Sequence, residues 1–134
     1  MFQIKTRVDY GLMIMLELAR QPKKTLSLSG LAQRLNISSA YLIQISQSLT
    51  KAGLIKSREG VQGGYILARP AGQISLLSII EALEGAISTR CLSGEKHCPG
   101  FSGCRVRGVW DFIIADIKTV LKKRTLASLL KKSL

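Results

Sequence analysis

The chain has 134 residues, the size of a single domain, and 46% of them are hydrophobic, which is enough to form a buried core. Lysine and arginine number 20 against 8 for aspartate and glutamate, and the formal charge of +12 favours DNA over RNA or a membrane surface as the partner. No run of about 18–20 apolar residues could span a bilayer, and residues 1–10 lack the apolar stretch of a secretion signal. We therefore expect a soluble, cytoplasmic protein with no membrane partner.

The first part of the chain has the pattern of a helix-turn-helix. Apolar residues at helical spacing predict three helices, over residues 8–20, 29–36 and 39–52. Ser38 can cap the third helix at its start, and Gly53 stands where a glycine commonly ends a helix. Two short helices joined by a brief turn are the outline of a unit that places its second helix in a DNA groove.

A β-hairpin is predicted directly after the third helix. Short strands at residues 54–58 and 65–68 flank a glycine-rich turn over 59–64, and a brief alternation predicts one more short strand at 25–28. A hairpin in this place is the wing of a winged helix-turn-helix. A further helix with apolar residues at core spacing closes the unit, so residues 1–85 are predicted to form a DNA-binding domain.

The rest of the chain divides into a cysteine segment, residues 86–104, and a helical end, residues 105–134. The cysteine segment has no helical or strand period and holds all three cysteines. After it, apolar residues recur at the heptad spacing of a helix that usually meets a partner helix, so we predict a homodimer, with packing inside one chain as the alternative. The heptad residues, here called the seam, are Val106, Trp110, Ile113, Ile117 and Val120. The predicted fold class is mainly α, a winged helix-turn-helix with a small β-hairpin wing and a long dimerisation helix.

The third helix and the wing supply the candidate DNA-binding residues. A helix N-terminus offers unpaired N–H groups to a phosphate, and Ser38 and Ser39 add hydroxyl groups there. Tyr41 can bond to a phosphate and Gln44 to an adenine edge. Plain capping by Ser38 and packing by Tyr41 are the alternatives. The other candidates are nearby cations and the glycines of the wing: Lys51, Arg58, Gly60, Gly63 and Gly64.

The cysteines have a spacing that suits a metal centre. Six residues separate Cys91 from Cys98, and five separate Cys98 from Cys104. This is not the two-residue spacing of zinc ribbons, but a loop of this kind lets three thiolates converge on one iron–sulfur cluster. Redox-active or inert thiols remain open as alternatives on spacing alone.

Over residues 4–130, the sequence resembles the IscR/NsrR family of bacterial transcriptional regulators. The resemblance implies a homodimer of winged-helix units with crossed long helices that binds palindromic, double-stranded promoter DNA. It also implies control by an iron–sulfur cluster, 2Fe-2S or 4Fe-4S, held by the three cysteines. The motifs that carry it are Asp9-Tyr10-Gly11-Leu12, Tyr41-Leu42, Lys51-Ala52-Gly53-Leu54, the turn from Gly60 to Tyr65, the three cysteines, Trp110 and Thr125-Leu126.

The resemblance leaves the fourth cluster ligand open. IscR-like members use a histidine three residues after the third cysteine, and this chain has Arg107 there, which cannot ligate a metal. NsrR-like members can use an aspartate of the first helix from the partner subunit, and Asp9 matches it; a carboxylate is a hard, exchangeable ligand. Asp9 could equally serve only as a favourable charge at the helix N-terminus. His97 and Glu95 in the cysteine segment are the other candidates.

These observations predict a homodimeric transcriptional regulator, expected to be a repressor, whose promoter binding is controlled by an iron–sulfur cluster. The alternative is a cluster-free winged-helix regulator controlled by thiol redox state or by a partner protein. An enzyme or electron carrier is not expected, because the chain has one histidine and no nucleophile–base pair or phosphate-binding loop.

Overall fold

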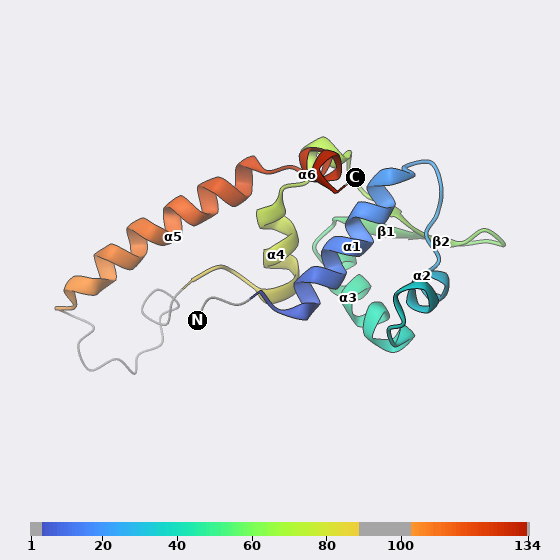
Figure 1. The fold of residues 1–134 in the computed structure, drawn as a ribbon, viewed down its shortest axis with the longest axis horizontal. Coiled ribbons are helices and arrows are strands. Elements are labelled where there is room, and N and C mark those ends of the chain that lie inside the picture. Colours follow the sequence, from blue (N-terminus) through green and yellow to red (C-terminus); the bar gives the residue numbers. More distant parts are fainter. Residues whose placement is uncertain (1–3, 89–102, 134) are drawn as a thin grey trace.

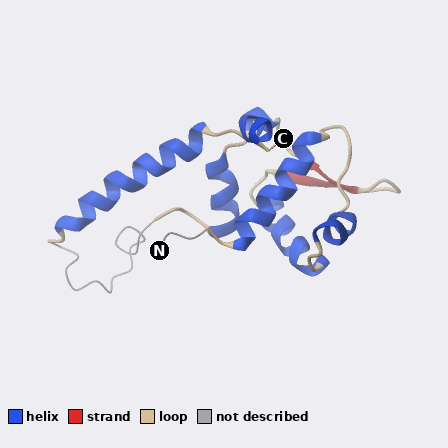
Figure 2. Cartoon of the chain, viewed as in Figure 1, coloured by secondary structure: helices blue, strands red, loops and turns tan. Residues whose placement is uncertain are grey.

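The computed structural model describes residues 4–88 and 103–133 (Figure 1). Six α-helices, a two-stranded hairpin and one 3-10 turn make up this described part, and helix dominates (Figure 2). The predicted fold class is confirmed. The elements are α1 (Thr6–Arg20), α2 (Leu28–Leu35), α3 (Ser39–Lys51), β1 (Ile55–Arg58), β2 (Gly64–Leu67), η1 (Ala71–Gln73), α4 (Leu76–Glu84), α5 (Arg105–Lys123) and α6 (Leu126–Lys132). None of the helices in the described ranges is long and apolar enough to cross a membrane.

The turn between α2 and α3 depends on Asn36. Its backbone lies in the left-handed region, at φ 54° and ψ 47°, and its N–H donates to the carbonyls of Ala32 and Gln33. Asparagine reaches this conformation more easily than other residues with a side chain, so α2 ends there and the chain turns sharply. The predicted helix-turn-helix is therefore present, with α2 beginning at Leu28, one residue earlier than expected.

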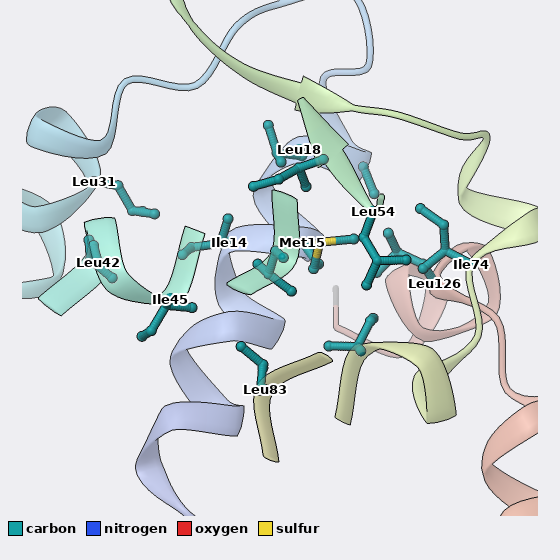
Figure 3. Packing of buried hydrophobic residues seen from close by; sticks show 14 of the residues in the cluster. Ile14, Met15, Leu18, Leu31, Leu42, Ile45, Leu54, Ile74, Leu83 and Leu126 are labelled. Carbon is teal, nitrogen blue, oxygen red and sulfur yellow. The ribbon is translucent and has the colours of Figure 1, made fainter. Parts of the chain in front are cut away.

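The core forms around α1, which contacts α3, α4 and α6 (Figure 3). Apolar residues one turn apart face inward from each helix, and each fully buried Leu or Ile stabilises the fold by about 1.5–3 kcal/mol. Three such residues hold α3 in place, so its orientation is fixed by the core and not by its polar face. The core residues of these helices are Ile14, Met15, Leu18, Leu42, Ile45, Leu49, Ile79, Leu83 and Leu126.

Directly after α5, the chain is hydrogen-bonded to the segment before α4 and so returns to the body of the protein, the helices packed around α1. The N–H of Leu76 donates to the carbonyl of Arg124 at 2.7 Å, and the N–H of Leu126 donates to the carbonyl of Ile74, also at 2.7 Å. Thr125 caps the last helix, because its hydroxyl accepts from the N–H of Ser128 in a reciprocal capping box. As a result α6 packs into the body, whereas α5 extends away from it (Figure 1).

The wing is attached to the loop before α2. Its strands pair antiparallel, from Ile55 opposite Leu67 to Arg58 opposite Gly64. The extra strand predicted at residues 25–28 is wrong: it is reduced to one bridge, in which Leu26 and Tyr65 exchange N–H···O bonds of 2.9 and 3.0 Å. The pairing stops there because the next residues turn into α2.

Gly64 allows this close approach of the loop and the wing. A Cβ added at Gly64 would lie 2.5 Å from the carbonyl oxygen of Leu26, which is much closer than a real contact. We expect Gly64→Ala to lower the free energy of unfolding by about 1–3 kcal/mol, since the clashing atom is backbone already bonded to Tyr65. Urea denaturation measures the loss. Gly72→Ala is the control, because an added Cβ there meets nothing within 4 Å; equal stabilities of the two variants would contradict the close approach.

Candidate DNA interface and cysteine segment

The outward face of α3 is polar and exposed. Leu42, Ile45, Ser46 and Leu49 are buried, so the opposite face of the helix turns to solvent. Ser39, Gln44 and Lys51 of α3 were predicted from the sequence to contact DNA, and all three are exposed. The structure adds two residues to the same face that sequence reasoning did not select, Ile43 and Gln47. Their positions four and eight residues after Ser39 are the helical signal that could have identified them.

Ile43 gives this face an unusual chemistry. It is 44% exposed and is not part of the hydrophobic core. In a major groove an apolar side chain suits the methyl group of thymine, and glutamine suits adenine. Ile43, Gln44 and Gln47 are therefore side chains of the kinds that contact thymine and adenine in a major groove.

Ser38 and Tyr41 have different surroundings in the structure. Ser38 occupies the N-cap position of α3, but the expected capping bond from its side chain is absent, so the exposed hydroxyl does not close the helix end. Tyr41 is half-buried and its ring meets the edge of Tyr10 in α1, with centroids 5.8 Å apart at 85°. Aromatic pairs of this geometry stabilise by about 0.5–1.5 kcal/mol beyond burial. The packing alternative for Tyr41 is thus real, and it orients the phenol beside the reading face.

The turn of the wing is built from glycine. Gly60 has φ 121°, a conformation that side chains rarely adopt, and the N–H of Gly63 donates to its carbonyl at 2.9 Å. Arg58 is exposed at the end of β1, just before this turn. Gly60, Gly63 and Gly64 therefore shape the wing, and Lys56 and Arg58 of β1 are its exposed cations.

A hydrogen bond connects α1 to α3, the second helix of the helix-turn-helix and hence its recognition helix. The guanidinium of Arg7 donates a short hydrogen bond to the hydroxyl of Ser48 in α3. Asp9, two residues further along α1, is exposed. The sequence did not reveal this link, because its partners are 41 residues apart. The first turn of α1 thus holds α3 on one side and presents a carboxylate to solvent on the other.

The candidate cluster ligands are only partly within the described residues. Cys91, Cys98, His97 and Glu95 lie outside them. Cys104 is a free, half-buried thiol directly before α5. Within residues 4–88 and 103–133, no group of three or more His, Cys, Asp or Glu is arranged to hold a metal ion. Figure 1 shows that the start of α5, whose N-cap residue is Cys104, lies well away from α1, the helix that carries Asp9.

The seam on α5 is uncovered in the protomer. The helix packs against α4 near the body, yet none of its residues is buried. Val106 is 54% exposed, Trp110 42% and Val120 57%, whereas Ile117 is half-buried. Apolar residues in a continuous exposed row are typical of a surface that meets another protein.

Comparisons with known proteins identify the family of this chain. The model of the Rrf2 family, described as an iron-dependent transcriptional regulator, matches residues 4–132. The chain belongs to the Rrf2 family. The expected relationship to IscR-type regulators is confirmed, and the chain is a DNA-binding transcriptional regulator of the Rrf2 type.

Two kinds of relative occur among the similar proteins. The regulator CymR of Bacillus subtilis is 38% identical over 129 residues, which cover 95% of this chain and 88% of that protein. The regulator IscR of Xenorhabdus nematophila is 32% identical over 131 residues, covering 96% of this chain and 79% of that protein. The solved IscR of T. potens has a TM-score of 0.78 at 34% identity, covering 99% of this chain and 89% of that chain. The solved B. subtilis CymR, titled the global cysteine regulator, has a TM-score of 0.76 at 35% identity and covers 98% of both chains.

The role of the outward face of α3 in DNA binding can be tested at Gln44. On an operator selected from random duplexes with the wild-type protein, Gln44→Ala should weaken binding by about 1–3 kcal/mol and relax the base preference at one position, because the amide contacts a base edge. Fluorescence anisotropy measures the affinities. Gln73→Ala removes an equally exposed glutamine from η1 and serves as control; if both variants bind like the wild type, Gln44 does not read a base.

Proposed function

We propose that this Rrf2-type regulator is a homodimer whose promoter binding is controlled by an iron–sulfur cluster held by Cys91, Cys98 and Cys104. The observation that carries the proposal is the position of α5: an uncovered apolar seam extends from the body, and its first residue follows directly on Cys104. A helix that joins two subunits would therefore begin at a cluster ligand. Repression is the expected outcome of promoter binding.

The dimer follows from the cost of leaving the seam in water. Trp110, Val106 and Val120 all face solvent in the protomer, and burying an apolar side chain stabilises by about 1.5–3 kcal/mol. The heptad spacing of the seam fits a second copy of the same helix. If two copies of α5 paired, the two copies of α3 would lie at a fixed separation, as a palindromic site requires.

Asp9 is the proposed fourth ligand, supplied by the partner subunit. Its carboxylate is exposed, and the start of α5 in its own chain lies away from it (Figure 1). Arg107 cannot ligate a metal, and it stands at the position of the IscR histidine. When bound, the cluster would supply iron whose ligands nitric oxide or oxygen can displace.

Control of DNA binding requires only that the two states differ in DNA affinity. If Asp9 is held by the partner's cysteine segment, the first turn of α1 is held with it. Arg7, in that same turn, bonds to Ser48 of α3, so the position of α1 would bias the position of the recognition helix. Release of Asp9 would relax that bias.

A second candidate keeps the DNA binding and removes the cluster. It is favoured by the similarity to CymR. The solved oxidized form of Staphylococcus aureus CymR matches this chain with a TM-score of 0.72 at 34% identity. Under this alternative the cysteines respond directly to oxidation or to a partner protein. Arg107 is compatible with it, because no fourth ligand is then needed.

Colour and metal content distinguish the two candidates. Anaerobically purified wild type is expected to be brown, to contain iron and sulfide in equal amounts, and to lose colour and change DNA affinity under nitric oxide. Replacing all three cysteines by alanine should give a colourless protein. Asp9→Ala should lower the iron and sulfide content, since one ligand is missing, whereas Glu59→Ala removes a carboxylate from the wing and should keep the cluster.

Two results would contradict the proposal. A colourless wild type without iron, whose DNA affinity changes only with thiol oxidants, would support the second candidate. An unchanged cluster in Asp9→Ala would exclude Asp9 as a ligand while leaving the three cysteines in place.

The dimer is tested on neighbouring residues of α5. We expect Ile113→Asp to convert the dimer into a monomer, because it places a charge in the seam. Phe112 lies outside the heptad positions and is 69% exposed, so Phe112→Asp should leave the dimer intact. Light scattering during size-exclusion chromatography gives the masses; a monomeric wild type, or loss of the dimer in Phe112→Asp alone, would rule out the proposed seam.

A further inference from the structure

A basic hollow lies between the loop after α1 and the wing. Its volume is about 560 Å³, and residues from two distant parts of the chain line it. The loop contributes Lys23, Lys24 and Thr25, and the hairpin contributes the stretch from Arg58 to Gln62. Arg58 and Gly60 are already DNA-binding candidates, but Lys23 and Lys24 have no role in the function described above, and the sequence gives no hint that these two segments meet.

The charges around the hollow are unbalanced. Lys23, Lys24 and Arg58 are all exposed, and Glu59 is the single carboxylate in the lining. In the described part of the chain, none of these three cations takes part in a salt bridge. Three cations that share one hollow without neutralising partners attract an anion, and closely spaced phosphates of a nucleic acid backbone offer several charges at once.

The loop that carries the lysines is joined to the wing by hydrogen bonds of the next two residues, Thr25 and Leu26. The hydroxyl of Thr25 donates to the carbonyl of Gln62, at the wing turn, with a distance of 2.6 Å. The bridge between Leu26 and Tyr65 adds two backbone bonds next to it. On the other side, the N–H of Lys24 donates to the carbonyl of Gln21 at 2.9 Å and closes a turn. The backbone of the lysine pair is therefore held beside the wing turn.

The wing needs cations from outside its own turn. Its apex, residues 59–62, carries one carboxylate and no basic side chain, and Val61 at the tip is fully exposed. A tip without basic side chains can enter a DNA groove, but it cannot hold the phosphates on either side. Arg58 stands at one strand of the wing, and Lys23 and Lys24 stand beside its turn.

We propose that Lys23 and Lys24, positioned by Thr25, bind backbone phosphates of double-stranded DNA beside the groove that the wing enters. The proposal rests on the DNA binding proposed above and is independent of the cysteine segment and of any cluster. The lysines would supply affinity without base preference, because phosphate contacts carry no sequence information directly. Thr25 would act as a positioning residue.

The test is the salt dependence of DNA binding. The probe is a fluorescent random-sequence duplex of about 30 base pairs, long enough for two half-sites one helical turn apart. For K23Q/K24Q the plot of log affinity against log salt should be shallower than that of the wild type by about 3.6 per bound dimer, since each protomer loses two phosphate contacts and each lost contact removes about 0.9 from the slope. The full-length protein is used throughout.

The matched control is K131Q/K132Q. It removes the same charge from α6, which Figure 1 places away from both α3 and the wing. Its slope should equal that of the wild type. An unchanged slope in K23Q/K24Q, or an equal reduction in both variants, would overturn the proposal, the latter because it reports net charge alone. A wild type whose binding does not depend on salt would instead contradict the proposed DNA-binding function itself.

Thr25 is tested by a pair of substitutions. Thr25→Val removes the bond to Gln62 and keeps both lysines, so the slope should become shallower, whereas Thr25→Ser keeps the hydroxyl and should preserve the wild-type slope. A wild-type slope in Thr25→Val would show that the lysines do not depend on Thr25. Thermal unfolding of both variants separates loss of positioning from loss of the fold.

Discussion

Two backbone hydrogen bonds between the start of α4 and the start of α6 determine how the molecule is divided. They join Leu76 to Arg124 and Leu126 to Ile74, and they return the end of the chain to the core. Leu126 is then fully buried beside α1. The chain is held at this point, while α5, which precedes it, extends outward from the core with most of its apolar seam uncovered. The helix that would join subunits therefore lies apart from the helix-turn-helix (Figure 1).

Helix α1 is the element through which these two parts can influence each other. Its inner face supplies Ile14 and Met15 to the core, and its first turn holds the recognition helix through Arg7 and Ser48. The Tyr10–Tyr41 ring contact adds a second connection on the same side. A signal that acts on the exposed start of α1 would therefore reach α3 without passing through the core. Displacing a rigid helix by a small amount is enough, since DNA affinity depends on where α3 lies in the groove.

Local patterns in the sequence predicted the elements well where one face of a helix is buried. The spacing of Leu42, Ile45 and Leu49 located α3, and Asn36 marked the turn before it. Contacts between distant residues could not be predicted in this way: the bond from Thr25 to the wing and the bond from Arg7 to Ser48 follow from the packing of whole elements. The missing cap at Ser38 is a side-chain rotamer, which no spacing determines. For Cys91 and Cys98 the prediction remains a prediction, because both lie outside the described residues.

The base and the apex of the wing differ in what they allow. At the base, Gly64 touches the backbone of Leu26, and any side chain there would separate the hairpin from the loop. At the apex, Val61 is fully exposed. Substitutions at the tip can therefore accumulate without a cost in folding, while the base stays constant. A regulator built in this way can acquire new target sites during evolution by changing the groove-facing tip on an unchanged support.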